Sequence, residues 1–261
     1  MNTVIVPVDF SETSLNAARY AAKFLVGHKE MSIILYHSYS KASELEETKK
    51  NLDELKAELS AGNDLTFETL AQQEDAFIDG LERAVRHRAA DLVIMGITGR
   101  NAIAQIFIGS NTLKMAERKA CPVLIVPEKA EYHEVKNVML SSDFNHTQKV
   151  TPSVPIKKVL NISRPNLHIV NVDPAHYISI TTHYQQEQEN LREMFAEYNP
   201  EFHFMRLFDV DEALNLFAEE KNIDIIIAVQ HNHSFLQKLY KRSRTQSISY
   251  KSNVPILIIH E

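Results

Sequence analysis

The sequence is poor in cysteine: Cys121 is the single cysteine among 261 residues. One cysteine excludes an intrachain disulfide and fits a reducing compartment, so we expect a cytoplasmic protein. The sequence also lacks an apolar run near the ~20 residues that a membrane-spanning helix needs. The apolar segment Met1 to Phe10 has no basic region before it, which favours a core strand over a signal peptide. We therefore expect no membrane association.

An excess of positive charge is also missing. The net charge is -6 and the sequence pI is about 6.1. Because binding to DNA or RNA needs a clustered basic surface, we expect no nucleic-acid partner. Hydrophobic residues make up 44% of the chain, enough for an ordinary buried core. The length fits one or two domains.

The first half of the chain alternates short β-branched runs with amphipathic segments. This alternation predicts an α/β fold with a parallel sheet covered by helices on both faces. The predicted strands are residues 4–8, 32–36, 65–70, 91–95 and 121–127. The predicted helices lie between them, from the N-caps at 11–13 to Leu25, then over 44–60 and 76–85, and after a glycine loop.

The second half repeats this order. Asp224 to Ala228 echoes Asp91 to Met95, and Val254 to Ile259 echoes Cys121 to Val126, both at an offset of 133 residues. Val138 to Phe144 echoes Val4 to Phe10 at an offset of 134. This register predicts an internal duplication with domains at 1–130 and 136–261. In the second domain Pro152 and Pro155 interrupt the first helix, which we expect to begin near Pro155.

Glycine is scarce, and all six glycines lie in the first half; they are Gly27, Gly62, Gly80, Gly96, Gly99 and Gly109. Gly96, Gly99 and Gly109-Ser110 together form the pattern G-x2-G-x9-G-S after the fourth predicted strand. Ligands of open parallel sheets bind beyond the carboxyl ends of the strands. Glycines there admit a phosphate close to the backbone, and the free N–H groups of the following helix suit an anion. The alternative is a loop whose glycines only turn the chain.

The pattern is neither a Walker A loop nor G-x-G-x-x-G. Together with the strand Val4 to Asp9 and the closing segment Cys121 to Pro127, it resembles the ATP-binding branch of the universal stress protein family. The resemblance covers the whole chain as a tandem pair and is more specific in the first half. It implies two tandem Rossmann-like domains, similar to adenine nucleotide α-hydrolases, each with a five-stranded parallel sheet.

The resemblance also implies the ligand and its contacts. ATP, with or without Mg²⁺, or another adenine nucleotide would bind the first domain. Its adenosine would lie against Pro7, Val8, Asp9 and Ser38, where the family usually has a valine in place of Ser38. Its phosphates would lie on the loop, against Gly96, Thr98, Gly99, Arg100, Gly109, Ser110, Asn111 and Thr112.

The same loop in the second half has lost its glycines. The offset of 133 places Val229, Asn232 and Arg242 at the three glycine positions, and Ser243 at the position of Ser110. We predict that this half does not bind ATP in the family manner. Its basic residues, from Lys238 to Lys251, either meet a different anionic ligand or an acidic partner, or form a solvated face. His231 and His233 could ligate a metal, but they lack a clear third ligand, so we assign no metal site.

No reaction centre is evident in the sequence. Cys121 precedes a proline and enters an apolar strand, so we expect a buried residue and not a nucleophile. The expected function is a stress-response, nucleotide-dependent regulatory module with at most weak ATPase activity. The alternative is a slow ATP-hydrolysing or adenylate-transferring enzyme of the same superfold. Domains of this family often pair through their last strands. The resemblance therefore implies an intrachain pseudo-dimer, and it does not decide whether two chains also form a homodimer.

Overall fold

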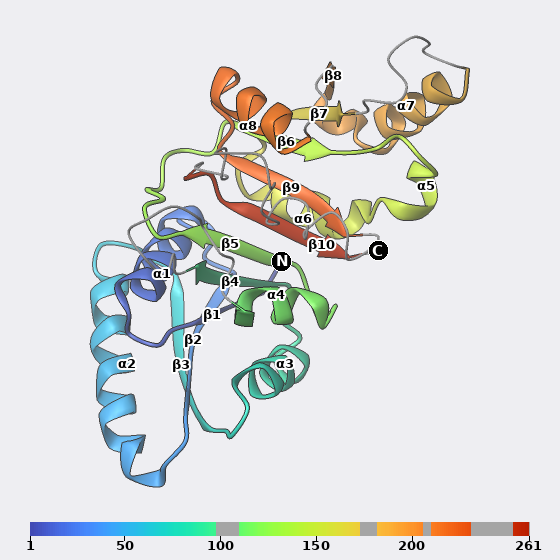
Figure 1. Cartoon of the computed structure of the whole chain (residues 1–261). Coiled ribbons are helices and arrows are strands. Elements are labelled where there is room, and N and C mark those ends of the chain that lie inside the picture. Colours follow the sequence, from blue (N-terminus) through green and yellow to red (C-terminus); the bar gives the residue numbers. More distant parts are fainter. Residues whose placement is uncertain (98–109, 173–181, 206–209, 231–252, 261) are drawn as a thin grey trace. The chain divides into compact units, whose positions relative to one another are not determined.

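The computed structural model describes residues 1–97, 110–172, 182–205, 210–230 and 253–260. These residues form two compact units, which divide between Tyr132 and His133. The helices and strands of both units are labelled in Figure 1. Each unit contributes five parallel strands and its own helices. No helix in these ranges combines the length and apolar character that crossing a bilayer requires.

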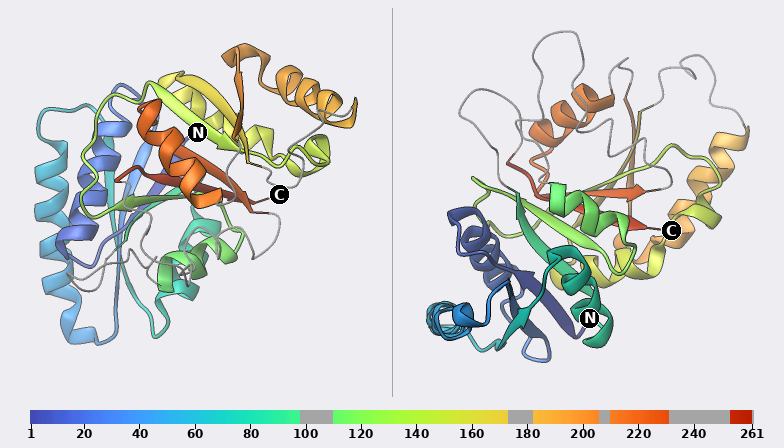
Figure 2. Two further views of the ribbon diagram at one scale, coloured as in Figure 1. Left: turned by 45° about the horizontal axis from the view of Figure 1, so that its top comes forward. Right: turned by 60° about the horizontal axis from the view of Figure 1, so that its bottom comes forward.

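The first unit alternates strands and helices along the chain. Its elements are β1 (Thr3–Pro7), α1 (Glu12–Phe24), β2 (Ser32–Tyr39), the 3₁₀ turn η1 (Ala42–Glu44), α2 (Leu45–Ser60), β3 (Thr66–Gln73), α3 (Phe77–His87), β4 (Leu92–Ile97), α4 (Ser110–Glu117) and β5 (Val123–Pro127). The strands pair in parallel in the order β3-β2-β1-β4-β5. Helices α1 and α2 lie on one face of this sheet and α3 and α4 on the other (Figure 2).

The second unit has the same succession with one helix broken. Its elements are β6 (Asn137–Ser141), α5 (Thr147–Val150), α6 (Ser153–Ser163), β7 (Asn166–Val172), α7 (Thr182–Met194), the 3₁₀ turn η2 (Ala196–Tyr198), β8 (Glu201–Met205), α8 (Val210–Glu220), β9 (Ile225–Gln230) and β10 (Ile256–His260). The parallel strand order is β10-β9-β6-β7-β8. The predicted fold class is therefore confirmed in both halves.

The central strands of both units are buried almost completely, as the continuous apolar runs predict. Val4, Ile5 and Val6 of β1 have no exposed surface, and Ile226 and Ile227 of β9 are at most 1% exposed. A strand covered on both faces needs apolar side chains at every position, which explains the absence of polar alternation in these segments.

Helix starts follow the caps and prolines of the sequence. The side chain of Ser11 accepts a hydrogen bond from the Ser14 N–H and caps α1. In the second unit, the equivalent stretch is split into α5 and α6 around Thr151 and Pro152. Helix α6 begins at Ser153, two residues before the predicted start at Pro155, because proline is tolerated in the first turn of a helix.

Backbone details repeat between the units, as the predicted duplication implies. The carboxylate of Asp91 accepts the N–H groups of Asn2 and Thr3, and Asp224 accepts those of Lys136 and Asn137 in the same way. Phe10 and Phe144, 134 residues apart, both adopt a positive φ, at 61° and 52°. Positive φ is uncommon for phenylalanine, so its recurrence at matching positions shows that the two turns share one backbone conformation.

Candidate functional site

The carboxyl ends of β1 and β2 form the corner where the sequence places adenosine. Pro7 lies beside Tyr36 in the ladder, and the Val8 N–H donates to the Tyr36 carbonyl at 2.8 Å. His37 Nδ1 lies 2.7 Å from the Val8 carbonyl oxygen. Because a carbonyl only accepts, Nδ1 carries the proton. Val8 is 4% exposed, so its side chain belongs to the core and not to the surface of this corner.

Asp9 is turned toward the start of helix α1. Its Oδ1 accepts the Ser11 N–H at 3.1 Å and the Ser11 hydroxyl at 2.6 Å. Burial raises the pKa of Asp9, but hydrogen bonds from Ser11 and Ser14 outweigh it and hold the pKa below its ordinary value. The carboxylate is therefore charged at neutral pH and fixed in place. Asp143 receives the Asn145 N–H in the matching turn of the second unit.

Gly96 lies inside β4, one residue before its end, and faces helix α1. A Cβ added to Gly96 would lie 2.5 Å from the Thr13 carbonyl oxygen and 2.9 Å from Thr13 Cγ2. Real Cβ atoms do not approach backbone atoms this closely, so α1 can pack here only against a glycine. This first motif glycine thus has a packing role that the sequence pattern alone did not indicate.

The end of the motif coincides with the start of a helix. Helix α4 begins at Ser110, as predicted, and packs on β4 and β5. Asn111 is exposed at this helix start. Thr112, expected to offer its hydroxyl to a phosphate, is instead only 2% exposed and belongs to the core side of the helix. Thr98, Gly99, Arg100 and Gly109 lie outside the described residues.

The structure therefore brings two groups of predicted residues to the carboxyl edge of one sheet. Pro7, Val8, Asp9 and Ser38 follow or end the paired strands β1 and β2. Gly96 stands on β4, the other neighbour of β1. A parallel sheet places such residues on the edge where ligands of this fold class bind.

In the second unit the same corner is filled by side chains. Asn171 stands where His37 stands in the first unit, and its Nδ2 donates to the Ser142 carbonyl at 2.9 Å. The Tyr184 hydroxyl donates to Asn171 Oδ1 at 3.1 Å. The Tyr184 ring also packs against Phe144 and Phe204, with ring centroids 5.7 and 6.3 Å apart. Asn171 is 3% exposed under this cover.

The difference between the corners of the two units arises at one position of the helix that follows β2 or β7. An offset of 136 residues aligns the buried positions Leu55 and Leu59 of α2 with Leu191 of α7 and with Phe195, which directly follows α7. The same offset places Tyr184 opposite Thr48, which is also buried but far smaller. Loss of the loop glycines and closure of this corner by an aromatic ring thus occur in the same unit. Among the three loop positions of this unit, Val229 lies in β9, and Asn232 and Arg242 fall in ranges that the structure does not describe.

Cys121 has the properties of an unreactive thiol. It is half-buried at the entry to β5, and burial raises its pKa to about 12. Since the thiolate is the nucleophilic form, a thiol with so high a pKa is a poor nucleophile at neutral pH. This agrees with the expectation of a structural residue.

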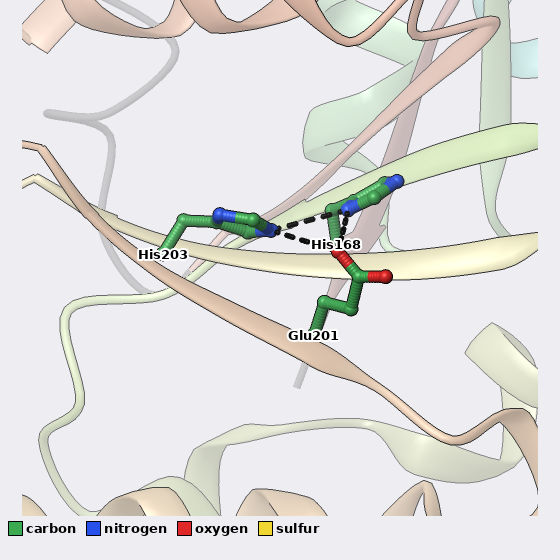
Figure 3. Close-up of side chains that lie close together, drawn as sticks. All are labelled: His168, Glu201 and His203. Atoms are coloured by element: carbon green, nitrogen blue, oxygen red, sulfur yellow. Dashed lines mark hydrogen bonds and ion pairs between the residues drawn. The ribbon is translucent and has the colours of Figure 1, made fainter.

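Sequence reasoning missed a cluster in the second unit made of His168 on β7 and Glu201 and His203 on β8 (Figure 3). Burial lowers the pKa of His168, and the nearby Lys221 lowers it further against the opposing effect of Glu201. Burial, His168 and Lys221 likewise lower the pKa of His203. The available signal was the alternation Glu-x-His on one strand with a histidine inside its neighbour.

Comparison with known proteins agrees with this architecture. The family model described as "Universal stress protein family" matches residues 1–127. A universal stress protein from Thermus aquaticus is 25% identical over 134 residues, which cover 48% of this chain and 97% of that protein.

Solved structures extend the likeness of fold to both units. A universal stress protein from Archaeoglobus fulgidus DSM 4304 superposes with a TM-score of 0.71 at 17% identity, covering 99% of this chain and 98% of that one. A protein of unknown function from Pseudomonas aeruginosa PAO1 gives a TM-score of 0.66 at 13% identity, with 100% and 92% covered. At these identities the likeness shows the fold alone. Taken with the match to residues 1–127, the N-terminal part of this chain belongs to the universal stress protein family.

Proposed function

We propose that the first unit binds one ATP molecule and that the protein acts as a nucleotide-dependent regulatory module in a stress response. The observation that carries this proposal is the context of the motif: G-x2-G-x9-G-S begins inside β4 and ends where α4 starts. A glycine-rich connection from a parallel strand to a helix start is a phosphate-binding arrangement.

The triphosphate would lie against the motif and the first turn of α4. The free N–H groups at the helix start and the positive end of the helix dipole favour an anion there. Ser110 is the first residue of α4, and in this proposal its hydroxyl would donate a hydrogen bond to a phosphate. Thr112 would act only through its backbone, since its side chain is buried.

The adenosine would lie at the ends of β1 and β2. His37 fixes the Val8 carbonyl, and Asp9 is held charged by Ser11. Carboxylates commonly accept ribose hydroxyls in folds of this kind. Ser38, near the end of β2, replaces a more usual valine, and a backbone contact there tolerates that change.

The experiment is calorimetric titration of the full-length protein with ATP. We expect one ATP per chain, loss of binding in Gly109→Arg, and weakened binding in Ser110→Ala by roughly tenfold, the ~1.4 kcal/mol scale of a hydrogen bond to a charged group. Ser243→Ala alters the equivalent position of the second unit and is the matched control, with no expected effect. Two sites per chain, no site, or an equal response to Ser243→Ala would contradict the proposal.

A further inference from the structure

We propose that His168, Glu201 and His203 form a binding site for a divalent transition metal ion, with Zn²⁺ as the best-fitting ion. The site lies wholly in the second unit and is independent of ATP binding in the first. Figure 3 shows the three side chains converging from two neighbouring strands.

The pairing of β7 with β8 brings the ligands together. His168 is the direct ladder partner of Glu201, and His203 follows two residues later, opposite Val170. Successive side chains of a strand point to opposite faces, so Glu201 and His203 share a face while Phe202 between them points away. Phe202 indeed packs against Phe144 and under Arg192 of α7, whereas His168 and His203 pack against Phe217 of α8.

The separations between the ligand atoms match a metal coordination sphere. His168 Nδ1 lies 3.2 Å from His203 Nε2 and 3.4 Å from Glu201 Oε2, and the last two atoms lie 3.6 Å apart. Zinc bonds of ~2.0–2.2 Å in tetrahedral geometry hold their ligand atoms roughly 3.3–3.6 Å from one another. One ion can therefore bond all three atoms with little movement of the side chains.

Hydrogen bonds within the cluster leave one of its three contacts unmade. An imidazole nitrogen carries either one proton or one lone pair, directed in the plane of the ring. His168 Nδ1 has two polar neighbours, His203 Nε2 and Glu201 Oε2, and it can form a good hydrogen bond with only one of them. A cation between the three atoms would engage a lone pair from each, which removes the conflict.

The surroundings favour zinc over a hard cation. Two imidazoles and one carboxylate are the donors that zinc accepts, whereas Ca²⁺ and Mg²⁺ prefer sites made of oxygen. His168 is 5% exposed and lies at the buried end of the site. The Glu201 side chain is 62% exposed and lies at the end of the site that faces solvent. A water molecule can therefore reach the fourth coordination position. Glu201 also supplies negative charge against nearby Lys221, which acts on both histidines.

The test is a titration of the full-length protein, stripped with a chelator, with ZnCl₂ alone. We expect one ion per chain, and tetrahedral absorption bands when Co²⁺ replaces Zn²⁺. Glu201→Gln, at an exposed position that leaves the fold intact, and His203→Gln should each weaken binding at least about tenfold. His133→Ala changes an exposed histidine of the same unit and is the matched control.

The proposal would be overturned by absence of stoichiometric zinc binding. Unchanged affinity in both Glu201→Gln and His203→Gln would overturn it as well, since the ion would then lie elsewhere. The double variant His231→Ala/His233→Ala tests that other location. If the double variant loses zinc binding while Glu201→Gln keeps it, the ion binds at His231 and His233 instead. Circular dichroism of each variant separates a lost ligand from a lost fold.

Discussion

Gly96 illustrates how one residue can meet two demands. The motif suggests that it admits a phosphate, and the structure shows that helix α1 presses against it through Thr13. The second unit has Val229 at the equivalent position, so that unit has accommodated a side chain where the first has none. A glycine in this motif therefore does not by itself prove contact with a ligand.

Gly96→Ala should destabilise the protein even without nucleotide. The added Cβ meets backbone atoms of Thr13, which cannot rotate away, so β4 or α1 must shift. Overpacking of this kind costs about 1–3 kcal/mol. Urea unfolding should show a lower midpoint with an unchanged slope, while Lys23→Ala on the exposed side of α1 should change stability by no more than ~0.5 kcal/mol. Equal stability of Gly96→Ala and the parent protein would refute the packing role.

At the scale of elements, a buried acid of α7 is hydrogen-bonded to the first part of the split helix in the second unit. Glu187 of α7 is 7% exposed, and its Oε2 accepts the Thr147 N–H at 2.8 Å and the Thr147 hydroxyl at 2.5 Å. Helix α5 has only four residues and begins at Thr147, so a side chain from another helix provides its cap. Burial raises the pKa of Glu187, but the hydrogen bonds from Thr147 outweigh it and leave the pKa lowered.

Acid should therefore loosen the contact between α5 and α7. A carboxyl whose pKa is lower in the folded state stabilises the fold above its ordinary pKa, and this contribution disappears as the pH falls through the folded value. Glu187→Gln should cost roughly 1.5–3 kcal/mol at neutral pH, as expected for hydrogen bonds to a charged group.

The measurement for Glu187→Gln is the free energy of unfolding as a function of pH. The difference between variant and parent should shrink as the pH falls below the ordinary glutamate value of about 4.3. A difference that stays constant down to strong acid would show that the charge of Glu187 is not involved. Glu193→Gln on the exposed side of α7 is the matched control.

At the scale of the whole molecule, two copies of one scaffold carry different chemistry at different places. The first copy keeps the glycine motif and has Thr48 at the position of Tyr184, and the second has Tyr184 over the matching corner and the cluster of His168, Glu201 and His203 on β7 and β8. Each ligand should therefore stabilise its own unit. A ligand that binds only the folded state adds ~2.7 kcal/mol at a hundredfold excess over its Kd.

Hydrogen exchange measured by mass spectrometry can resolve these contributions. ATP should slow exchange mainly in peptides from residues 1–132, and Zn²⁺ mainly in peptides from β7, β8 and α8. Protection by ATP in the β6–β7 corner to the same degree as in the β1–β2 corner would contradict the asymmetry. Gly109→Arg should abolish the protection by ATP and keep the protection by Zn²⁺. Glu201→Gln should abolish the protection by Zn²⁺ and keep the protection by ATP.

The sequence by itself determined the α/β class, the duplication, the strands and most helix limits. These depend on local patterns: continuous apolar runs for buried strands, serine caps for helix starts, and prolines for breaks, as at Pro152. The same local reading located the glycine motif. The predicted start of α6 is two residues too late, because a proline is tolerated at several positions in the first turn of a helix.

Only the tertiary structure decided what depends on contacts between distant segments. The clash that requires Gly96 involves Thr13, the cover of Asn171 involves Tyr184, and the metal-type cluster joins β7 to β8 through their register. Burial likewise separates Thr112 from the surface although it stands beside exposed Asn111. Such relations follow from the packing of helices on sheets and from strand pairing, which bring together residues that no local pattern connects.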